Sequence, residues 1–210
     1  MSAFLEQQNW RYATKKFDST KIISNEDLST LKEAIRLSSS SYGLQPYQVF
    51  IIENKDLRAK IQPAAWGQAQ IVDASHLFVF ANRTDVTNED IDKYLKNVSE
   101  TRNIPETSLA GYGGFMKNGI GAKSIAEKAD WTSKQTYLAL ANLMNAAAEL
   151  KIDVTPMEGF VPNEVNEILG FNELGLSTAL IAPVGYRSEE DATQHQKKVR
   201  KSNEELFITL

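Results

Sequence analysis

Basic side chains gather near both ends of the sequence, and both clusters have the composition of an anion site. The first cluster is Arg11, Lys15 and Lys16, and the second is Lys197, Lys198, Arg200 and Lys201. Arginine forks and lysine point charges both bind phosphate well. A solvated basic face is the alternative for either cluster taken alone. In a chain of net charge −4, one phosphate would satisfy both clusters if the fold brought the two ends together.

Three further segments carry groups that suit a planar ligand. The loop SSSSYGLQP at 38–46 combines small hydroxyl side chains with a glycine and a stiff proline exit, although such clusters are usually plain polar turns. In AAWGQAQ, Gln68 and Gln70 are two residues apart, so an extended backbone would project both amides from one face. Amides pair with the edges of heteroaromatic rings. In PMEGF, Gly159 follows Glu158, and its missing Cβ would let a planar ligand approach the backbone closely.

The composition excludes several kinds of chemistry. The chain has no cysteine and only two histidines, which removes disulfides, thiolate catalysis and zinc–thiolate or iron–sulfur sites. His76 heads the apolar run HLFVFA, which favours a buried structural histidine over a metal ligand. G-x-S-x-G, the Walker A loop and G-x-G-x-x-G after a strand are all missing. We therefore predict no metal site and no catalytic side chain, and we expect a bound cofactor to carry the hard chemistry.

Charge and hydropathy also bound the location and partners. A mildly acidic chain gives no general reason to expect nucleic acid as a partner. No apolar run approaches the roughly 18 residues that a membrane helix needs. The N-terminal residues lack an apolar stretch of signal-peptide length. We expect a cytoplasmic protein that contacts neither membrane nor nucleic acid.

Helix and strand patterns alternate along the chain and predict one α+β domain over residues 1–210. Helices are expected at 24–37 with Ser24 as N-cap, at 54–61, at 85–98 opened by Thr87, and at 131–151; buried strands are expected at 48–53, 76–82 and 176–186. The helix at 131–151 is apolar around most of its circumference, so it must be covered on most sides. In a domain of this size, a second subunit is a natural source of that cover.

Five of the eleven glycines lie between Gly111 and Gly121. A structureless linker and a mobile lid both fit this composition. Tyr112 and Phe115 lie inside the segment and favour the lid, because linkers seldom carry aromatic residues.

Taken together and in order, six segments resemble the nitroreductase family of flavin-dependent oxidoreductases. They are RYATKKFD, SSSYGLQPY, DASHLFVF, WTSKQTYLALAN, PMEGF and KVR, and they cover nearly the whole chain. The resemblance implies a sandwich in which helices flank a central, mainly antiparallel sheet. It also implies an intertwined homodimer with FMN bound at each of two sites in the interface.

The resemblance assigns cofactor contacts residue by residue. Arg11, Lys198 and Arg200 would hold the FMN phosphate, and Lys15 would lie at the pyrimidine edge of the flavin, where its charge would stabilise the reduced ring. The remaining expected contacts are Tyr12, Ala13, Gln68, Gln70, Ser39, Ser40, Ser41 and Gly43 (the last four from the partner subunit), with Pro156, Met157, Glu158 and Gly159 backing the ring.

Three positions depart from better-known members of the family. Ala13 stands where a serine is common, Gly43 where an asparagine often touches the ring, and Gln70 where some relatives place a second lysine. Because a neutral amide stabilises an anionic reduced flavin less than a lysine does, we expect a lower flavin redox potential than in those relatives.

The expected function is an FMN-dependent NAD(P)H oxidoreductase that works by a ping-pong hydride transfer. Planar electron acceptors such as nitroaromatics and quinones would stack on Tyr112 or Phe115. One alternative is a specialised reductase of the same family, acting on enals or removing halogens. Another is a flavin-binding dimer without significant turnover. The sequence does not distinguish NADH from NADPH as the donor.

Overall fold

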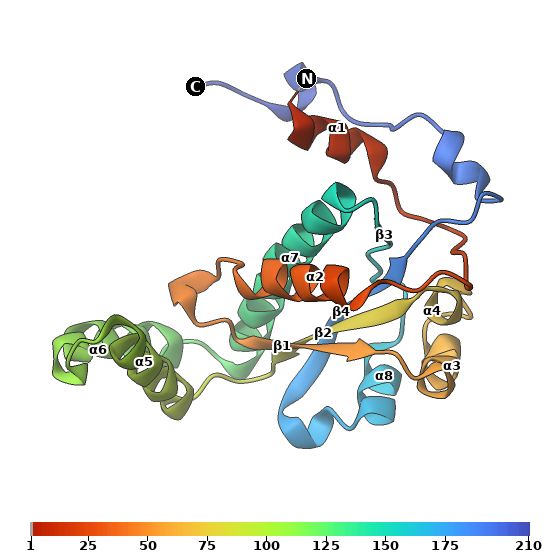
Figure 1. Cartoon of the computed structure of the whole chain (residues 1–210). Helices are drawn as coiled ribbons and strands as arrows, with labels where there is room; N and C mark the ends of the chain where they lie inside the picture. The colour runs from red at the N-terminus through yellow and green to blue at the C-terminus, as the bar shows by residue number, and fades with distance from the viewer. Residues whose placement is uncertain (1) are drawn as a thin grey trace.

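Four strands form one antiparallel sheet in the computed structural model, which describes residues 2–210 (Figure 1). In spatial order they are β1 (Tyr47–Ile52), β2 (His76–Arg83), β4 (Leu176–Gly185) and β3 (Asp153–Val154). The central pair, β2 and β4, is almost wholly buried, as expected for β-branched and aromatic runs covered on both faces. The predicted α+β class and antiparallel sheet are confirmed.

The helices are α1 (Ala3–Trp10), α2 (Asn25–Arg36), α3 (Lys55–Ala64), α4 (Gln70–Asp73), α5 (Asn88–Arg102), α6 (Ala110–Gly121), α7 (Ile125–Glu149), α8 (Pro162–Leu169) and α9 (Asn203–Leu206). The predicted caps are confirmed: the Ser24 and Thr87 side chains accept backbone hydrogen bonds that begin α2 and α5. The helix expected at 131–151 begins earlier, at Ile125, because Ser124 directly before it forms a reciprocal capping box with Glu127 in the first turn. Among the described residues, no helix is long and apolar enough to cross a membrane.

Alternating side chains divide the sheet between two cores. Phe78 and Phe80 of β2 face α2 and α7, while Leu77 and Val79 face α3 and α8. His76, 4% exposed at the start of β2, is buried as predicted.

The glycine-rich segment is a helix, so the linker expectation is wrong. Residues 110–121 form α6, whose Met116 and Ile120 are buried against α5. Together, α5 and α6 project beyond the sheet in Figure 1 and share a small apolar core. The packing of those apolar side chains offsets the low helix propensity of glycine. Mobility of this segment stays a prediction.

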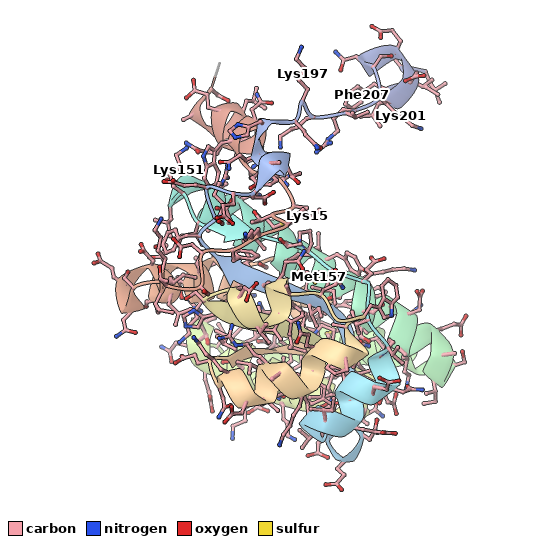
Figure 2. All side chains as sticks on the ribbon, turned by 90° about the vertical axis from the view of Figure 1, so that its right-hand side faces the viewer. Lys15, Lys151, Met157, Lys197, Lys201 and Phe207 are labelled. Atoms are coloured by element: carbon pink, nitrogen blue, oxygen red, sulfur yellow. The ribbon has the colours of Figure 1, made fainter. Side chains whose placement is uncertain are left out.

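Apolar side chains are exposed at many positions of the described residues, among them one group on α7 and one on the C-terminal segment. Tyr137 and Leu138 on α7 are 42% and 45% exposed, so part of the apolar circumference of α7 is uncovered within one chain. Phe207 and Ile208 lie exposed on the C-terminal segment, which runs away from the sheet in both views (Figures 1 and 2).

Candidate functional site

Arg11 of the first basic cluster meets Lys197, Lys198 and Arg200 of the second cluster. Arg11, Lys198 and Arg200 line one open pocket of about 290 Å³, together with Tyr12, Ala13, Pro156, Thr193, Gln196 and Lys197. Lys198 Nζ donates to the backbone carbonyl of Arg11, and Arg11 Nε donates to Gln8 Oε1 at 2.7 Å. The ends of the chain therefore build one cationic pocket, a name kept below for this group.

Within the part of the chain that the structure describes, no carboxylate neutralises the charges of the cationic pocket. Among residues 2–210, no carboxylate lies at ion-pair distance from Arg11, Lys198 or Arg200. Burial and then the charge of Arg200 lower the pKa of Arg11. Burial, followed by Arg11 and Arg200, lowers the pKa of Lys198. Such mutual repulsion marks a place where an external anion is favoured.

The segment from Arg11 to Lys16, which we call the strap, is fixed by contacts with distant parts of the chain. Thr155 Oγ1 donates to the Thr14 carbonyl at 2.7 Å, and the backbone N–H groups of Lys15 and Lys16 donate to the Asp191 carboxylate. The Lys16 ammonium pairs with Glu190. Lys15 is exposed and has no carboxylate at ion-pair distance within residues 2–210. Figure 2 shows Lys15 between the C-terminal segment bearing Lys197 and the region of Met157.

The segment from Pro156 to Gly159 continues the sheet as a single bridge. Met157 N–H donates to the Ile181 carbonyl at 2.8 Å, and Ile181 N–H returns the bond at 3.1 Å. This pairing buries Met157 and leaves Pro156 and Glu158 exposed. Glu158 Oε1 accepts from the Tyr137 hydroxyl at 2.5 Å. Burial and this hydrogen bond raise the pKa of Tyr137 to about 12.

A second pocket adjoins the cationic pocket at Pro156. It has about 320 Å³ and is lined by Tyr137, Leu140, Pro156, Met157, Glu158 and Leu180. Since Pro156 lines both pockets, an apolar floor lies directly beside the cations. We call this second pocket the apolar pocket.

The expectation for Gln68 and Gln70 is wrong in its geometry. Gln70 begins the short helix α4 and is buried, so the two side chains do not project from one extended face. Gln68 Nε2 donates to the Gly159 carbonyl at 2.8 Å and to the Ala65 carbonyl at 3.0 Å. Gln68 therefore positions the Gly159 backbone, and whether either amide also contacts a cofactor stays a prediction.

Trp66 is a residue that sequence reasoning missed. It is 69% exposed and has a φ of 57°, an unusual backbone conformation for a bulky side chain. Its ring lies against Gly159, where an added Cβ would meet Trp66 Cζ3 at 2.9 Å. The signal available in the sequence was a tryptophan directly before a glycine in AAWGQAQ.

The loop from Ser39 to Gly43, which is predicted to contact the cofactor, lies away from both pockets of its own chain. The Ser41 N–H donates to Gln135 Oε1 at 2.8 Å, which ties this loop to α7. The Tyr112 hydroxyl donates to the Tyr42 carbonyl at 3.2 Å, and the Phe115 ring meets the Tyr42 ring edge-on at a centroid distance of 6.0 Å. The loop thus accompanies the aromatic residues of α6. None of these residues lines the cationic or the apolar pocket.

Comparison with known proteins identifies the family. Residues 9–186 match the Nitroreductase family. This chain belongs to the nitroreductase family. A Staphylococcus haemolyticus protein, provisionally named an NAD(P)H nitroreductase, is 39% identical over 95% of this chain and 93% of its own length. The major NAD(P)H-flavin oxidoreductase of Aliivibrio fischeri is 33% identical over 95% of each chain.

Solved structures of proteins similar to this chain have the same fold. The structure of a provisionally named Exiguobacterium sibiricum nitroreductase in complex with FMN superposes with a TM-score of 0.85 at 17% identity, covering 100% of this chain and 98% of that one. Within this chain, the predicted site residues fall into two groups: one around Pro156, and one formed by the Ser39–Gly43 loop with α6.

Proposed function

We propose that this nitroreductase is an FMN-dependent NAD(P)H oxidoreductase that reduces planar acceptors such as nitroaromatics or quinones by a ping-pong hydride transfer. The observation that carries the proposal is the junction at Pro156, where a cationic pocket without carboxylate partners adjoins an apolar pocket. A ligand with a phosphate at one end and a planar ring at the other matches that pair of pockets. The name of one relative, an NAD(P)H-flavin oxidoreductase, supports a flavin as that ligand, and the structure in complex with FMN supports FMN.

The residues present fit FMN. Arg11, Lys198 and Arg200 would hold its phosphate, because arginine and lysine are the residues best suited to phosphate oxygens. The backbone from Pro156 to Gly159 would back the ring, while Trp66 and Gln68 occupy the side on which Gly159 lacks a Cβ. Bound FMN would supply the hydride chemistry, accepting from NAD(P)H and donating to the acceptor.

The chain itself would orient the ring and adjust the local charge. Lys15 forms no ion pair with a carboxylate among residues 2–210, and it would place a positive charge at the pyrimidine edge of the flavin. Gln68 fixes the Gly159 carbonyl, and Tyr137 fixes the Glu158 carboxylate. Before any ligand binds, the first contact holds the Gly159 backbone that would face the ring, and the second holds the Glu158 side chain.

We further propose a homodimer in which the Ser39–Gly43 loop and α6 of one subunit complete the site of the other. The loop and α6 are joined to each other but line neither pocket of their own chain. Exposed Phe115 would then offer a ring face to a planar acceptor. Donor and acceptor would use the same open slot in turn.

An absorbance spectrum of the purified protein tests the proposal. We expect a yellow protein with about one FMN per subunit, which bleaches on anaerobic addition of NADH or NADPH. The faster donor identifies the preferred nicotinamide. A yellow protein that neither donor bleaches would contradict the oxidoreductase and favour a flavin-binding dimer. A colourless protein that FMN cannot reconstitute would contradict the proposed cofactor.

If the protein bleaches, a panel of acceptors measures its specificity. We expect comparable kcat/KM values for nitroaromatics and quinones. A preference of several orders of magnitude for one enal or halogenated substrate would instead identify a specialised reductase.

A further inference from the structure

We propose that Asp191 is the positioning residue of the phosphate site: one buried carboxylate holds the strap against the C-terminal segment so that cations from both ends of the chain converge. This inference rests on the proposed function, since it concerns the phosphate end of the FMN site. Asp191 precedes Thr193 and the basic residues of the C-terminal segment in the sequence.

The contacts of Asp191 come from both ends of the chain. Its Oδ2 accepts from the Tyr12 hydroxyl at 2.9 Å and from the backbone N–H groups of Lys15 and Lys16 at 2.7 and 3.2 Å. Its Oδ1 accepts from the Thr193 N–H at 3.0 Å. The residue is 3% exposed, so these donors replace water that the carboxylate has lost.

The groups that donate hydrogen bonds to Asp191 are not the cations of the pocket, so those cations stay available for a phosphate. Every hydrogen bond to Asp191 comes from a backbone N–H group or from a phenol, and none comes from Arg11, Lys198 or Arg200. Asp191 therefore fixes the strap without forming an ion pair with the groups that would bind phosphate. Burial opposes ionisation, but the hydrogen bonds from Lys15, Tyr12, Lys16 and Thr193 hold the pKa of Asp191 below its usual value.

Tyr12 is held from a second side. Its ring lies 4.5 Å from the guanidinium of Arg187, and the Trp10 ring covers the same guanidinium at 4.1 Å. The Asp153 carboxylate fixes Arg187 by accepting from its Nη2 at 2.6 Å, from its Nε at 3.0 Å and from its backbone N–H at 2.9 Å. The ring is thus tied to the edge of the sheet and the hydroxyl to Asp191. Arg11, between Trp10 and Tyr12, has little freedom to move away from Lys198.

Without such a tether, the like charges of the cationic pocket would push the strap and the C-terminal segment apart. Loss of the Asp191 charge should therefore weaken binding at the phosphate end of FMN and leave the ring end unchanged. Riboflavin has the same ring without the phosphate, so it reports the ring end alone.

The test compares the dissociation constants of FMN and riboflavin, measured by flavin fluorescence, for the wild type and Asp191→Asn. We expect the Kd for FMN to rise about tenfold or more, as for loss of a charged hydrogen-bond acceptor, and the Kd for riboflavin to change less than about twofold. Equal rises for both ligands would show a merely structural role. An unchanged Kd for FMN would also overturn the proposal. Failure of the wild type to bind FMN would instead contradict the proposed function.

Glu190→Gln is the matched control. It removes the same charge from the adjacent residue, whose exposed carboxylate pairs with Lys16, and we expect the Kd for FMN to change less than about twofold. If Asp191→Asn does not fold, Tyr12→Phe decides: it removes one donor to Asp191 and keeps the ring against Arg187. In Tyr12→Phe we expect the Kd for FMN to rise by a smaller factor and the Kd for riboflavin to stay unchanged. If the Kd for FMN does not rise selectively, the proposal is overturned.

The protein without flavin gives an independent readout. Trypsin should cleave after Lys15 and Lys16 faster in Asp191→Asn than in the wild type, because their backbone N–H groups lose the shared acceptor. Cleavage after Lys96 on the exposed face of α5 should keep its rate. Equal rates at the strap in the two proteins would contradict a tether at Asp191.

Discussion

Lys15 and Lys16 are neighbours with different surroundings, and this makes them a matched pair. The Lys16 ammonium pairs with Glu190, whereas Lys15 has no such partner among residues 2–210. We predict that Lys15→Ala slows reduction of bound FMN by NAD(P)H about tenfold or more, because a positive charge beside the ring is lost. The Kd for FMN should change less than about threefold. Anaerobic stopped-flow absorbance measures the rate, and Lys16→Ala is the control. Equal rates for wild type and Lys15→Ala would remove the role proposed for Lys15.

His76 predicts a pH dependence of stability. Its ring is buried and Nδ1 lies 2.8 Å from Ser75 Oγ. Burial, the largest cause, lowers the pKa of His76; Glu53 opposes this shift, and Arg58 and Lys32 add to it. As the pH falls, His76 in the unfolded chain therefore binds a proton near pH 6.5, whereas His76 in the folded protein binds one only at a lower pH. Stability should be fully present above about pH 6.5 and should fall as the pH drops toward the lowered folded pKa.

Urea unfolding between pH 5 and 7.5 measures this dependence. In His76→Gln, the free energy of unfolding should vary less with pH over that range than in the wild type, whatever the absolute cost of the substitution. His195→Gln, at an exposed position, should keep the wild-type slope. Parallel curves for the wild type and His76→Gln would contradict the prediction.

The sequence indicated which residues supply the positive charges of the cationic pocket, but not which residues position those charged side chains. The two basic clusters that contain Arg11, Lys198 and Arg200 are visible in the sequence, whereas the choice of these three as phosphate-binding residues came from the resemblance to the nitroreductase family. The role of Asp191 depends on backbone N–H groups more than 170 positions away, and backbone donors leave no trace in residue types. Gln68 was assigned the wrong geometry for a related reason: two residues spaced by two project together only from extended backbone, and here a helical turn begins.

At the scale of elements, the close approach of β4 to the turn before β2 makes a further prediction. An added Cβ at Gly185 would meet the Ser75 backbone nitrogen at 2.9 Å and Phe17 Cδ1 at 3.1 Å. Because backbone cannot yield as a side chain can, we predict that Gly185→Ala destabilises the protein by about 1–3 kcal/mol. Chemical denaturation measures the change.

Gly114→Ala is the matched control for this prediction. Gly114 lies within α6, and a Cβ added there would have nothing within 4 Å, so alanine should stabilise the helix by about 0.5–1 kcal/mol. Destabilisation by both substitutions to the same extent would contradict the assigned close contact at Gly185.

Elements with strong local signals were predicted well, and those decided by tertiary packing were not. The strands β2 and β4 and the caps Ser24 and Thr87 follow from apolar runs and hydroxyl side chains that act locally. Helix α6 is different, because its glycines lower intrinsic helix propensity and its stability comes from packing on α5. Composition alone therefore left a structureless linker open at a place where the structure has a helix.

At the scale of the whole molecule, the C-terminal segment predicts how subunits associate. Phe207 and Ile208 are exposed within one chain, and a partner subunit would remove such apolar surface from water. We predict that the double variant Phe207→Asp, Ile208→Asp shifts the proposed dimer toward monomer at micromolar concentration, as analytical ultracentrifugation would show. Leu174→Asp, at another exposed apolar residue, is the control. A dimer of unchanged affinity in the double variant would exclude this segment from the interface.

The tether between the two ends of the chain also has a consequence for biosynthesis. A chain is made from its N-terminus and its elements begin to fold in that order, so the strap is translated before the sheet. Asp191, Lys198 and Arg200, which would fix and complete the same pocket, are translated only after β4. The proposed phosphate site is therefore still unfinished while the sheet is being made, and we expect FMN to bind only after Arg200 has been translated.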